Sequence, residues 1–173
     1  MSSFYKWIEK IGQEEMDSHP LEPLFAIIKQ HLPRTSSVLC VGCGDGTELK
    51  FFENARGVDI RPQNNPLIDV GDMHNLPYGN EEFEMVFAKD VFEHAVAPIV
   101  ALEEMTRVSS KYVVIVLPDE SWTESGWHLI IPNMRQLMAL AEKVGLKLKY
   151  VREIRWLKDK QYLLENFIYV FEK

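Results

Sequence analysis

A glycine-rich turn is the feature of this sequence whose spacing best predicts chemistry. Gly42, Gly44 and Gly46 stand at alternate positions, after the apolar run Ser37–Val41 and before Thr47–Phe52, for which we expect a helix. Glycine permits a positive φ and lets a ligand approach the backbone closely. In an open α/β sheet, ligands bind at the carboxyl ends of the strands, where the strand order reverses. The pattern therefore predicts a ligand-binding loop between a buried strand and a helix.

Three kinds of ligand use such a turn, and the residues within it favour one of them. A dinucleotide-binding turn has its third glycine one residue later than Gly46, and a phosphate-binding loop has a lysine that is missing before Thr47. The carboxylate of Asp45 would repel a phosphate but tolerates the cationic sulfonium of S-adenosylmethionine. S-adenosylmethionine is therefore the favoured ligand, and a tight turn without a ligand is the alternative.

Acidic residues after the next two expected strands support the same interpretation. Asp59 lies in the strand expected over Ala55–Ile60, where a carboxylate can accept hydrogen bonds from both hydroxyls of a ribose. Asp72 follows the strand expected over Pro66–Val70 and could accept from an adenine amino group, with Met73 packing on the ring. A single Asp at a strand end is more often a turn residue. Three acids and three glycines at successive strand ends are harder to explain in that way.

Residues for a second substrate follow the fourth and fifth expected strands. Lys89, Asp90, Glu93 and His94 come after the strand expected over Phe83–Ala88. His94 would face the ligand bound at the glycine turn, or would be a cap or packing residue.

The loop after the fifth expected strand, residues 118–132, holds two tryptophans, three acids and His128. This composition predicts an acceptor pocket or lid. The alternative is a surface loop whose tryptophans cover the edge of the core. His128 is the best candidate for a general base.

The turn also holds Cys40 and Cys43, whose C-x-x-C spacing occurs in redox and metal sites. A thioredoxin-like pair is disfavoured because no tryptophan precedes it. A zinc site would need two further ligands, and the spacing of the candidates matches no zinc pattern. These candidates are His74, His94 and His128. We therefore expect no metal, and we interpret Cys40 as a small buried strand residue and Cys43 as a turn residue.

Short apolar runs alternate with helical patterns along the chain and must position these residues. Further strands are expected over Tyr112–Leu117, Leu146–Trp156 and Tyr162–Phe171, and helices over Val96–Val108 and Asn133–Val144, with Asn133 as N-cap and Gly145 as C-cap. Strands that alternate with helices imply parallel pairing through right-handed crossovers, hence a three-layer α/β sandwich. The polar turn between the last two strands favours an antiparallel hairpin.

Composition limits the class of protein. The chain has 173 residues, of which 46% are hydrophobic, and this predicts one domain with helices over residues 1–33 and a core over residues 34–173. A net charge of −7 without a basic run disfavours a nucleic-acid partner. The charged residues Lys6, Glu9 and Lys10 interrupt any signal peptide, and no apolar run approaches a membrane span. We therefore expect a cytoplasmic protein with reduced cysteines.

Taken in order, these motifs resemble the class I S-adenosylmethionine-dependent methyltransferases. The matching segments are Val41–Gly46 for the glycine-rich motif, Asp59 for the ribose-binding acid, Gly71–Tyr78 for the adenine side, Phe83–Phe87 for the fourth strand and Val91–His94 for the segment after it. The resemblance covers residues 38–117 and is closest to the small-molecule branch that includes the ubiquinone/menaquinone-biosynthesis type.

The resemblance implies a Rossmann-like sheet of seven strands in the order 3-2-1-4-5-7-6, with strand 7 antiparallel. It also implies a set of residues that contact the cofactor S-adenosylmethionine. They are Gly42, Cys43, Gly44, Asp45, Gly46, Asp59, Ile60, Asp72, Met73 and Lys89. One position departs from the family: Cys40 stands where an acid usually orients the methionine end of the cofactor.

These observations predict methyl transfer to a small molecule by in-line displacement. Such a reaction depends mainly on alignment, and it needs a general base only where the acceptor is protonated. His94 and His128 are thus the only candidate catalytic residues. The alternative is a non-catalytic protein that binds S-adenosylmethionine and keeps the fold. An NAD-dependent enzyme conflicts with the spacing of the glycines.

Overall fold

The computed structural model describes residues 37–118, 128–158 and 161–173, with the backbone alone for residues 153–158 and 161–165. The chain divides into two units, Met1–Arg34 and Thr35–Lys173, and the described residues all lie in the second. The helices predicted over residues 1–33 lie outside the described residues and stay a prediction. No helix in the described ranges is long and apolar enough to cross a membrane.

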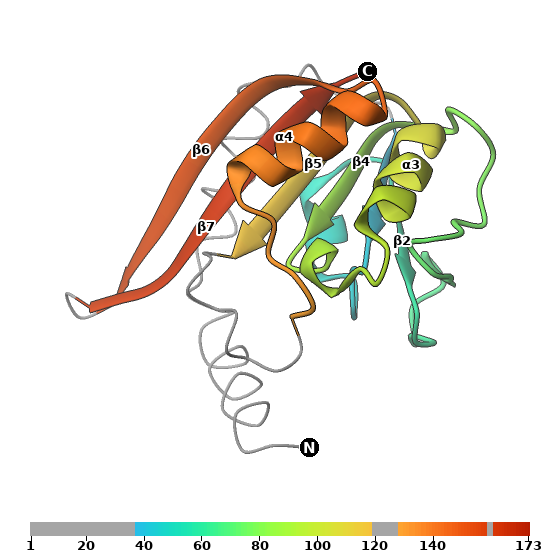
Figure 1. Ribbon diagram of the computed structural model, residues 1–173. Helices are drawn as coiled ribbons and strands as arrows, with labels where there is room; N and C mark the ends of the chain where they lie inside the picture. Colours follow the sequence, from blue (N-terminus) through green and yellow to red (C-terminus); the bar gives the residue numbers. More distant parts are fainter. Residues whose placement is uncertain (1–36, 119–127, 159–160) are drawn as a thin grey trace. The chain divides into compact units, whose positions relative to one another are not determined.

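A seven-stranded sheet organises the described part of the chain (Figure 1). Its strands are β1 (Val38–Val41), β2 (Ala55–Asp59), β3 (Ile68–Val70), β4 (Phe83–Lys89), β5 (Ser109–Pro118), β6 (Lys147–Lys158) and β7 (Gln161–Glu172). They lie in the order β3-β2-β1-β4-β5-β7-β6. The pairs from β3 to β5 are parallel, whereas β7 is antiparallel to both β5 and β6. This confirms the predicted Rossmann-like α/β sheet, its order and its antiparallel strand.

The central strands are buried along most of their length, as continuous apolar runs predict. Every residue of β1 is buried, and in β5 the run Tyr112–Pro118 is buried without a break. The core includes Leu39, Val86, Leu102, Val113 and Phe171, all fully buried. This packing fixes the carboxyl ends of β1, β2, β4 and β5, from which the candidate site residues project.

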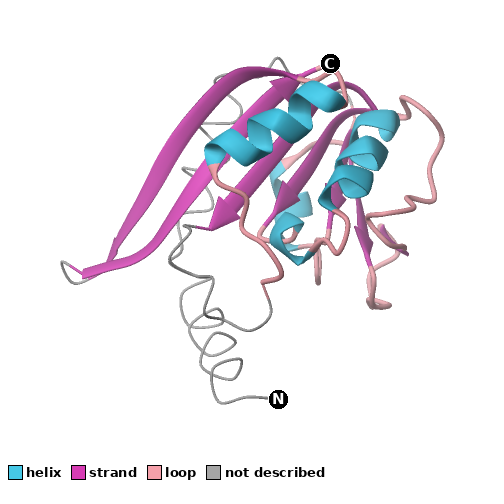
Figure 2. Cartoon of the chain, in the orientation of Figure 1, coloured by secondary structure: helices cyan, strands magenta, loops and turns pink. Residues whose placement is uncertain are grey.

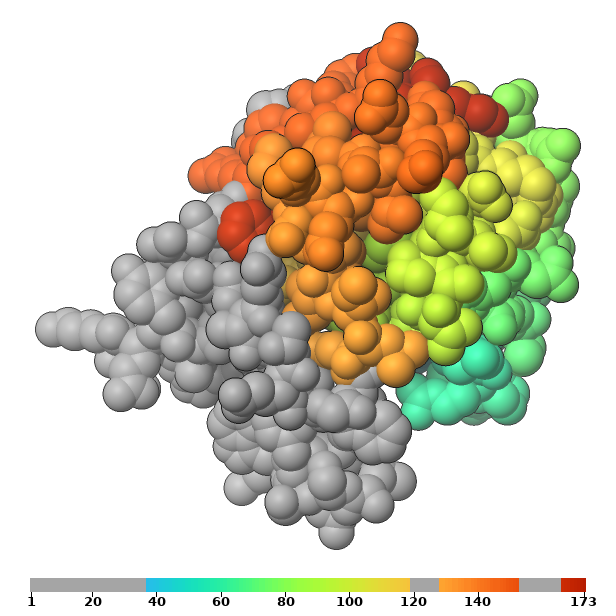
Figure 3. Space-filling model, in the orientation of Figure 1, coloured from blue at the N-terminus to red at the C-terminus, as the bar shows by residue number. Residues whose placement is uncertain are grey.

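Two α-helices, α3 (Pro98–Val108) and α4 (Met134–Lys143), pack against each other on one face of the sheet (Figure 2). Both helices are on the side of the described residues that Figure 3 presents, α3 in yellow-green and α4 in orange. α3 buries one stripe of side chains, among them Leu102 and Met105. The apolar residues at helical spacing thus form the buried faces of the two helices that the sequence predicts.

The segment after the glycine turn differs from its prediction. Instead of an α-helix over Thr47–Phe52, the structure has the short 3-10 helix η1 (Thr47–Phe51). Phe52 already has extended backbone, and β2 begins at Ala55. The connection back to the sheet is therefore too short for a full helix. As a result, the glycine turn is followed by this short 3-10 helix and not by a long α-helix, whose dipole would point at the turn.

A capping box begins α4 and confirms Asn133 as its N-cap. The Asn133 side chain accepts from the Gln136 N–H at 3.0 Å, and the Gln136 side chain accepts from the Asn133 N–H at 3.0 Å. Each bond satisfies a backbone donor that a helix start would otherwise leave unpaired. At the other end the C-cap is Val144, and Gly145 follows it with a φ of +81°. The predicted C-cap was thus one residue late.

Replacing the N-cap is expected to have a measurable but limited effect. Asn133→Ala should lower the free energy of unfolding by about 1 kcal/mol, because the Gln136 N–H loses its acceptor. Denaturant unfolding measures the change. Asn133→Asp keeps an acceptor oxygen and should remain close to the natural chain. An alanine variant as stable as the natural chain would contradict the role of the cap.

Candidate active site

The glycine turn lies at the carboxyl end of β1, between β2 and β4, where the strand order reverses. Gly42, Gly44 and Gly46 all have positive φ angles, of 65°, 54° and 83°. The Gly42 N–H donates to the Val58 carbonyl at 2.7 Å, and the Gly46 N–H donates to the Cys43 carbonyl at 2.9 Å. The turn therefore has the backbone conformation and the place in the sheet that a ligand-binding loop needs.

Asp59 ties the turn to the end of β2. Its side chain is only 7% exposed; Oδ2 accepts from the Gly44 N–H at 2.9 Å and Oδ1 from the Arg61 N–H at 2.9 Å. A carboxylate has about four acceptor sites, so each oxygen keeps capacity for a further donor. The neighbouring Ile60 is 69% exposed, an apolar side chain left beside this carboxylate. The pair presents acceptors and an apolar surface at one strand end.

Asp45 and Asp72 both accept hydrogen bonds within their own turns. Asp45 Oδ1 accepts from the Thr47 N–H at 3.0 Å and from the Thr47 hydroxyl at 2.7 Å. Asp72 Oδ1 accepts from the His74 N–H at 2.9 Å and lies 2.6 Å from His74 Nδ1. These bonds from His74 lower the pKa of Asp72, which keeps it ionised. Met73, beside it, is half-buried against the core.

Lys89, at the end of β4, sits among acidic side chains. Its ammonium pairs with the carboxylate of Asp90. Burial lowers the pKa of Lys89, but the charges of Asp90 and Glu48 outweigh it and hold the pKa above its usual value. Burial in turn raises the pKa of Glu48. One lysine thus faces several carboxyl groups, an environment that favours a cationic ligand over a phosphate.

The backbone of Asp90 is strained, and hydrogen bonds to β5 and β7 hold it in that conformation. Its φ is +50°, which is uncommon for a residue other than glycine. Its N–H donates to the Val116 carbonyl at 3.0 Å, and Asn166 Nδ2 donates to its Oδ1 at 2.9 Å. Asn166 lies in β7, far away in the sequence, and nothing in the local pattern indicated its contribution. The bond ties β7 to the loop after β4.

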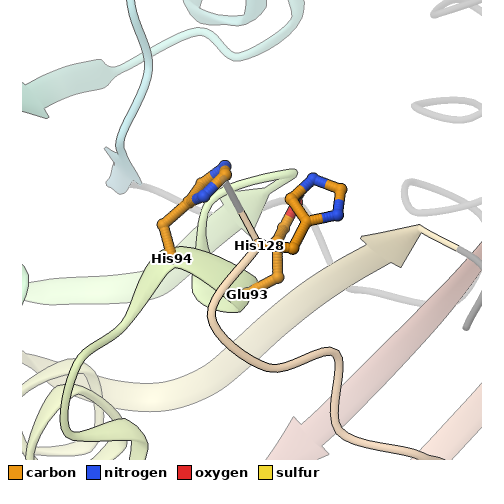
Figure 4. Close-up of side chains that lie close together, drawn as sticks. All are labelled: Glu93, His94 and His128. Atoms are coloured by element: carbon orange, nitrogen blue, oxygen red, sulfur yellow. Dashed lines mark ion pairs between the residues drawn. The ribbon is translucent and has the colours of Figure 1, made fainter. Parts of the chain in front are cut away.

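Three side chains converge directly beyond this loop: Glu93, His94 and His128 (Figure 4). Glu93 and His94 come from the 3-10 helix η2 (Phe92–His94), and His128 comes from the segment that leads to α4. The two imidazole rings lie 5.2 Å apart between centroids. His128 Nε2 lies 4.0 Å from Glu93 Oε1. The two predicted acceptor-side histidines are thus brought together, and Glu93 joins them.

Glu93 is the most unusual group in the cluster. Its side chain is 1% exposed, and within the described ranges neither carboxyl oxygen has a hydrogen-bond partner. Burial, reinforced by the charge of Asp90, raises the pKa of Glu93 to about 8. Sequence reasoning placed Glu93 near the site but did not predict its burial. Buried polar groups are normally paired, so this carboxyl group needs an explanation.

Both cysteines are free and buried, which confirms the predicted burial of Cys40. Gly57 leaves room for Cys43, since a Cβ at that position would lie 2.4 Å from Cys43 Sγ. Burial raises the pKa of Cys43 to about 12 and also raises that of Cys40. A thiol that stays protonated is a poor nucleophile and a poor metal ligand.

The thiols of the folded protein are expected to be unreactive. At pH 8, iodoacetamide should modify Cys40 and Cys43 at least about a hundredfold more slowly than in the urea-unfolded chain, because little thiolate forms and access is blocked. Mass spectrometry over time measures both rates. Rapid modification of the folded chain, or a disulfide between the two cysteines, would contradict this prediction.

A pocket of about 270 Å³ opens beyond the carboxyl end of β5. Its lining is mainly apolar and includes Leu117, Pro118, Ile131, Phe167 and Tyr169. None of the residues of the glycine turn lines it, so it is separate from the predicted cofactor cradle. The segment that carries His128 continues through Ile131 to this pocket. The tryptophans and acids predicted to form an acceptor loop, residues 119–127, lie outside the described residues.

Comparison with protein families gives one match. Residues 39–117 match the family model described as a methyltransferase domain. This range contains the glycine turn, Asp59, Asp72, Lys89 and the η2 helix. No match was found among curated protein sequences.

Solved structures share the fold at low sequence identity. The chain is similar to the Burkholderia thailandensis 1,6-didemethyltoxoflavin-N1-methyltransferase, solved with 1,6-didemethyltoxoflavin and S-adenosylhomocysteine bound. The TM-score is 0.77 at 15% identity, over 98% of this chain and 85% of that one. It is also similar to a SAM-dependent methyltransferase from Aquifex aeolicus, with a TM-score of 0.64 at 16% identity over 92% and 97% of the two chains.

Proposed function

We propose that this chain is a class I S-adenosylmethionine-dependent methyltransferase that transfers a methyl group to a small-molecule acceptor by in-line displacement. The observation that carries the proposal is the bond between Asp59 and the Gly44 N–H. It joins the acid at the end of β2 to the glycine turn at the end of β1. The two elements that would hold the ribose and the methionine part of one cofactor are thereby set in one rigid arrangement.

The proposed seat of the cofactor follows from this arrangement. Asp59 accepts from the ribose hydroxyls, and the exposed Ile60 side chain packs on the adenine ring. Asp72 accepts from the adenine amino group beside Met73. The backbone of the turn, Gly42–Gly46 with Cys43 and Asp45 inside it, and the backbone at Lys89 line the methionine end. Each of these elements offers a carboxylate, an apolar side chain or backbone groups near the carboxyl ends of the parallel strands.

The charges around Lys89 suit the reaction itself. The cofactor carries a positive sulfonium, and the acidic side chains of Asp90 and Glu48 interact electrostatically with Lys89 at this edge. After transfer the sulfur is neutral, so this electrostatic attraction is lost. The displacement needs alignment of the acceptor atom, the methyl carbon and the sulfur more than it needs acid or base. His94 and His128 can take a proton where the acceptor carries one.

A small acceptor is favoured by the size of the pocket beyond the carboxyl end of β5. Ligand pockets usually measure about 300–1,000 Å³, and the pocket beyond β5, at about 270 Å³, is near the lower limit. Its apolar lining suits a planar or aliphatic molecule. The Burkholderia relative was solved with a small heteroaromatic acceptor bound, 1,6-didemethyltoxoflavin. The motifs of residues 71–78 and 91–94 extend the proposal to the ubiquinone/menaquinone-biosynthesis type.

Calorimetry and a transfer assay test the proposal in sequence. The full chain should bind S-adenosylmethionine in a one-to-one complex, and it should not bind NAD. Transfer of a radiolabelled methyl group to a panel of small hydroxylated and heteroaromatic compounds should then identify the acceptor class. Absence of cofactor binding would refute the proposal. Tight binding without transfer to any compound would instead support the non-catalytic alternative, which Cys40 in place of the usual acid motivates.

A further inference from the structure

We propose that Glu93, His94 and His128 bind one divalent transition-metal ion. One ligand atom from each residue lies within 4.8 Å of the other two (Figure 4). Two imidazole nitrogens and one carboxylate oxygen form a facial set that zinc, iron, cobalt and nickel accept readily. Sequence spacing alone matched no metal pattern, because the fold brings His128 to the other two residues from a distant segment.

The state of Glu93 is the second observation, and it is independent of the spacing. The carboxyl group is 1% exposed, and both of its oxygens lack a hydrogen-bond partner among the described residues. An isolated buried carboxylate is costly in free energy, so such groups are normally paired or coordinate a metal. A cation between Glu93 and the two histidines would supply the missing partner.

Backbone hydrogen bonds hold the two halves of the cluster together. The Leu129 and Ile130 N–H groups donate to the Glu93 carbonyl at 3.0 and 3.2 Å. His128 therefore stays beside η2, and its side chain is only 12% exposed. Metal–ligand bonds of ~2.1 Å in a tetrahedral site place ligand atoms roughly 3.4 Å apart. The 4.0 Å between His128 Nε2 and Glu93 Oε1 can close to this value by a small side-chain rotation.

Three protein ligands would leave at least one coordination position open, as in catalytic rather than structural metal sites. An ion here would bind an oxygen or nitrogen of a small molecule and lower the pKa of a bound hydroxyl group. That use rests on the proposed methyl transfer, whereas binding of the ion does not.

Metal content of the purified protein tests the proposal. Protein without an affinity tag is stripped with a chelator, dialysed against limiting Zn²⁺ and analysed by elemental mass spectrometry. We expect about one equivalent of zinc per chain, with less than about a fifth of that in Glu93→Gln and in His128→Ala, because two ligands bind far more weakly than three. His74→Ala is the matched control: it removes a histidine outside the cluster and should keep the full equivalent.

A spectroscopic measurement identifies the ligands. Co²⁺ added to the stripped protein should give visible d–d bands of a site with nitrogen and oxygen ligands, absent from His94→Ala. A strong near-ultraviolet thiolate band would place the ion on Cys40 and Cys43 and overturn the proposal. Zinc content that is unchanged in Glu93→Gln and His128→Ala, or absent from the natural chain, would also overturn it.

Folding and cofactor binding are checked separately. Circular dichroism establishes whether each variant is folded. If Glu93→Gln does not fold, the zinc content of His128→Ala, whose side chain lies at the edge of the cluster, tests the proposal. S-adenosylmethionine affinity is measured on the stripped protein. Cofactor binding without metal binding would refute only the metal site, and metal binding without cofactor binding would refute only the proposed function.

Discussion

Gly42→Ala is expected to lower the free energy of unfolding by about 2–5 kcal/mol and to abolish binding of S-adenosylmethionine. The φ of +65° costs an L-residue roughly 1–2 kcal/mol. In addition, a Cβ at Gly42 would lie 2.2 Å from Val91 Cγ2 and 2.7 Å from Val91 Cβ. Overpacking of this kind costs about 1–3 kcal/mol, because Val91 is buried and cannot turn away freely. The turn and the start of η2 must therefore move apart.

Gly44→Ala separates the two contributions. Gly44 also has a positive φ, of 54°, but a Cβ there would meet no atom within 4 Å. The free energy of unfolding of the Gly44→Ala variant should fall by only about 1–2 kcal/mol, which is the cost of the backbone conformation. Denaturant unfolding of both variants, with calorimetry for the cofactor, makes the comparison. Equal destabilisation of the two variants would show that contact with Val91 is not the cause.

The sheet could be predicted from sequence because its signals are local. Continuous apolar runs such as Val38–Val41 and Tyr112–Leu117 indicate buried parallel strands, and the glycine turn indicates where the strand order reverses. The order of the seven strands came from the resemblance to a family. The outcome agrees at every strand pair.

Details that depend on chain geometry were harder to predict. The segment Thr47–Phe51 has helical residues, but the short connection to β2 limits it to a 3-10 helix. Asp45 was predicted to contact the cofactor, and in the structure one of its oxygens accepts from the Thr47 N–H and from the Thr47 hydroxyl. A carboxylate in a tight turn readily accepts a hydrogen bond from a backbone N–H of the same turn. Sequence patterns do not reveal this competition.

The candidate acceptor side shows the same limit over a longer range. His94 and His128 were each singled out by their place after a strand, but no periodicity relates one to the other. Their meeting depends on the bonds from Leu129 and Ile130 to the Glu93 carbonyl, which exist only in the folded chain. The burial of Glu93 is likewise a property of tertiary packing. Sequence reasoning could name the members of the cluster but could not assemble it.

Asp59→Asn is expected to weaken binding of S-adenosylmethionine about 10- to 100-fold. Both Asp59 oxygens accept from backbone N–H groups, those of Gly44 and Arg61. An amide offers only one acceptor oxygen, and its NH₂ group would face the other N–H donor. Hydrogen bonds to charged groups contribute about 1.5–3 kcal/mol, and each 1.4 kcal/mol corresponds to a factor of ten in affinity. The variant loses such a bond to the turn and weakens those proposed to the ribose.

Asp69→Asn is the matched control, because it makes the same change on the neighbouring strand. Asp69 pairs with Val58 in the register of β2 and β3, but its side chain is half-exposed, binds Arg56 and accepts from the Tyr78 hydroxyl at 2.9 Å. Exposed ion pairs contribute about 0–1 kcal/mol to stability, so this variant should bind the cofactor as the natural chain does. Calorimetric titration of the two variants side by side gives the answer. If Asp59→Asn keeps the natural affinity, the carboxylate does not hold the ribose, and the proposed seat of the cofactor is wrong at its central residue.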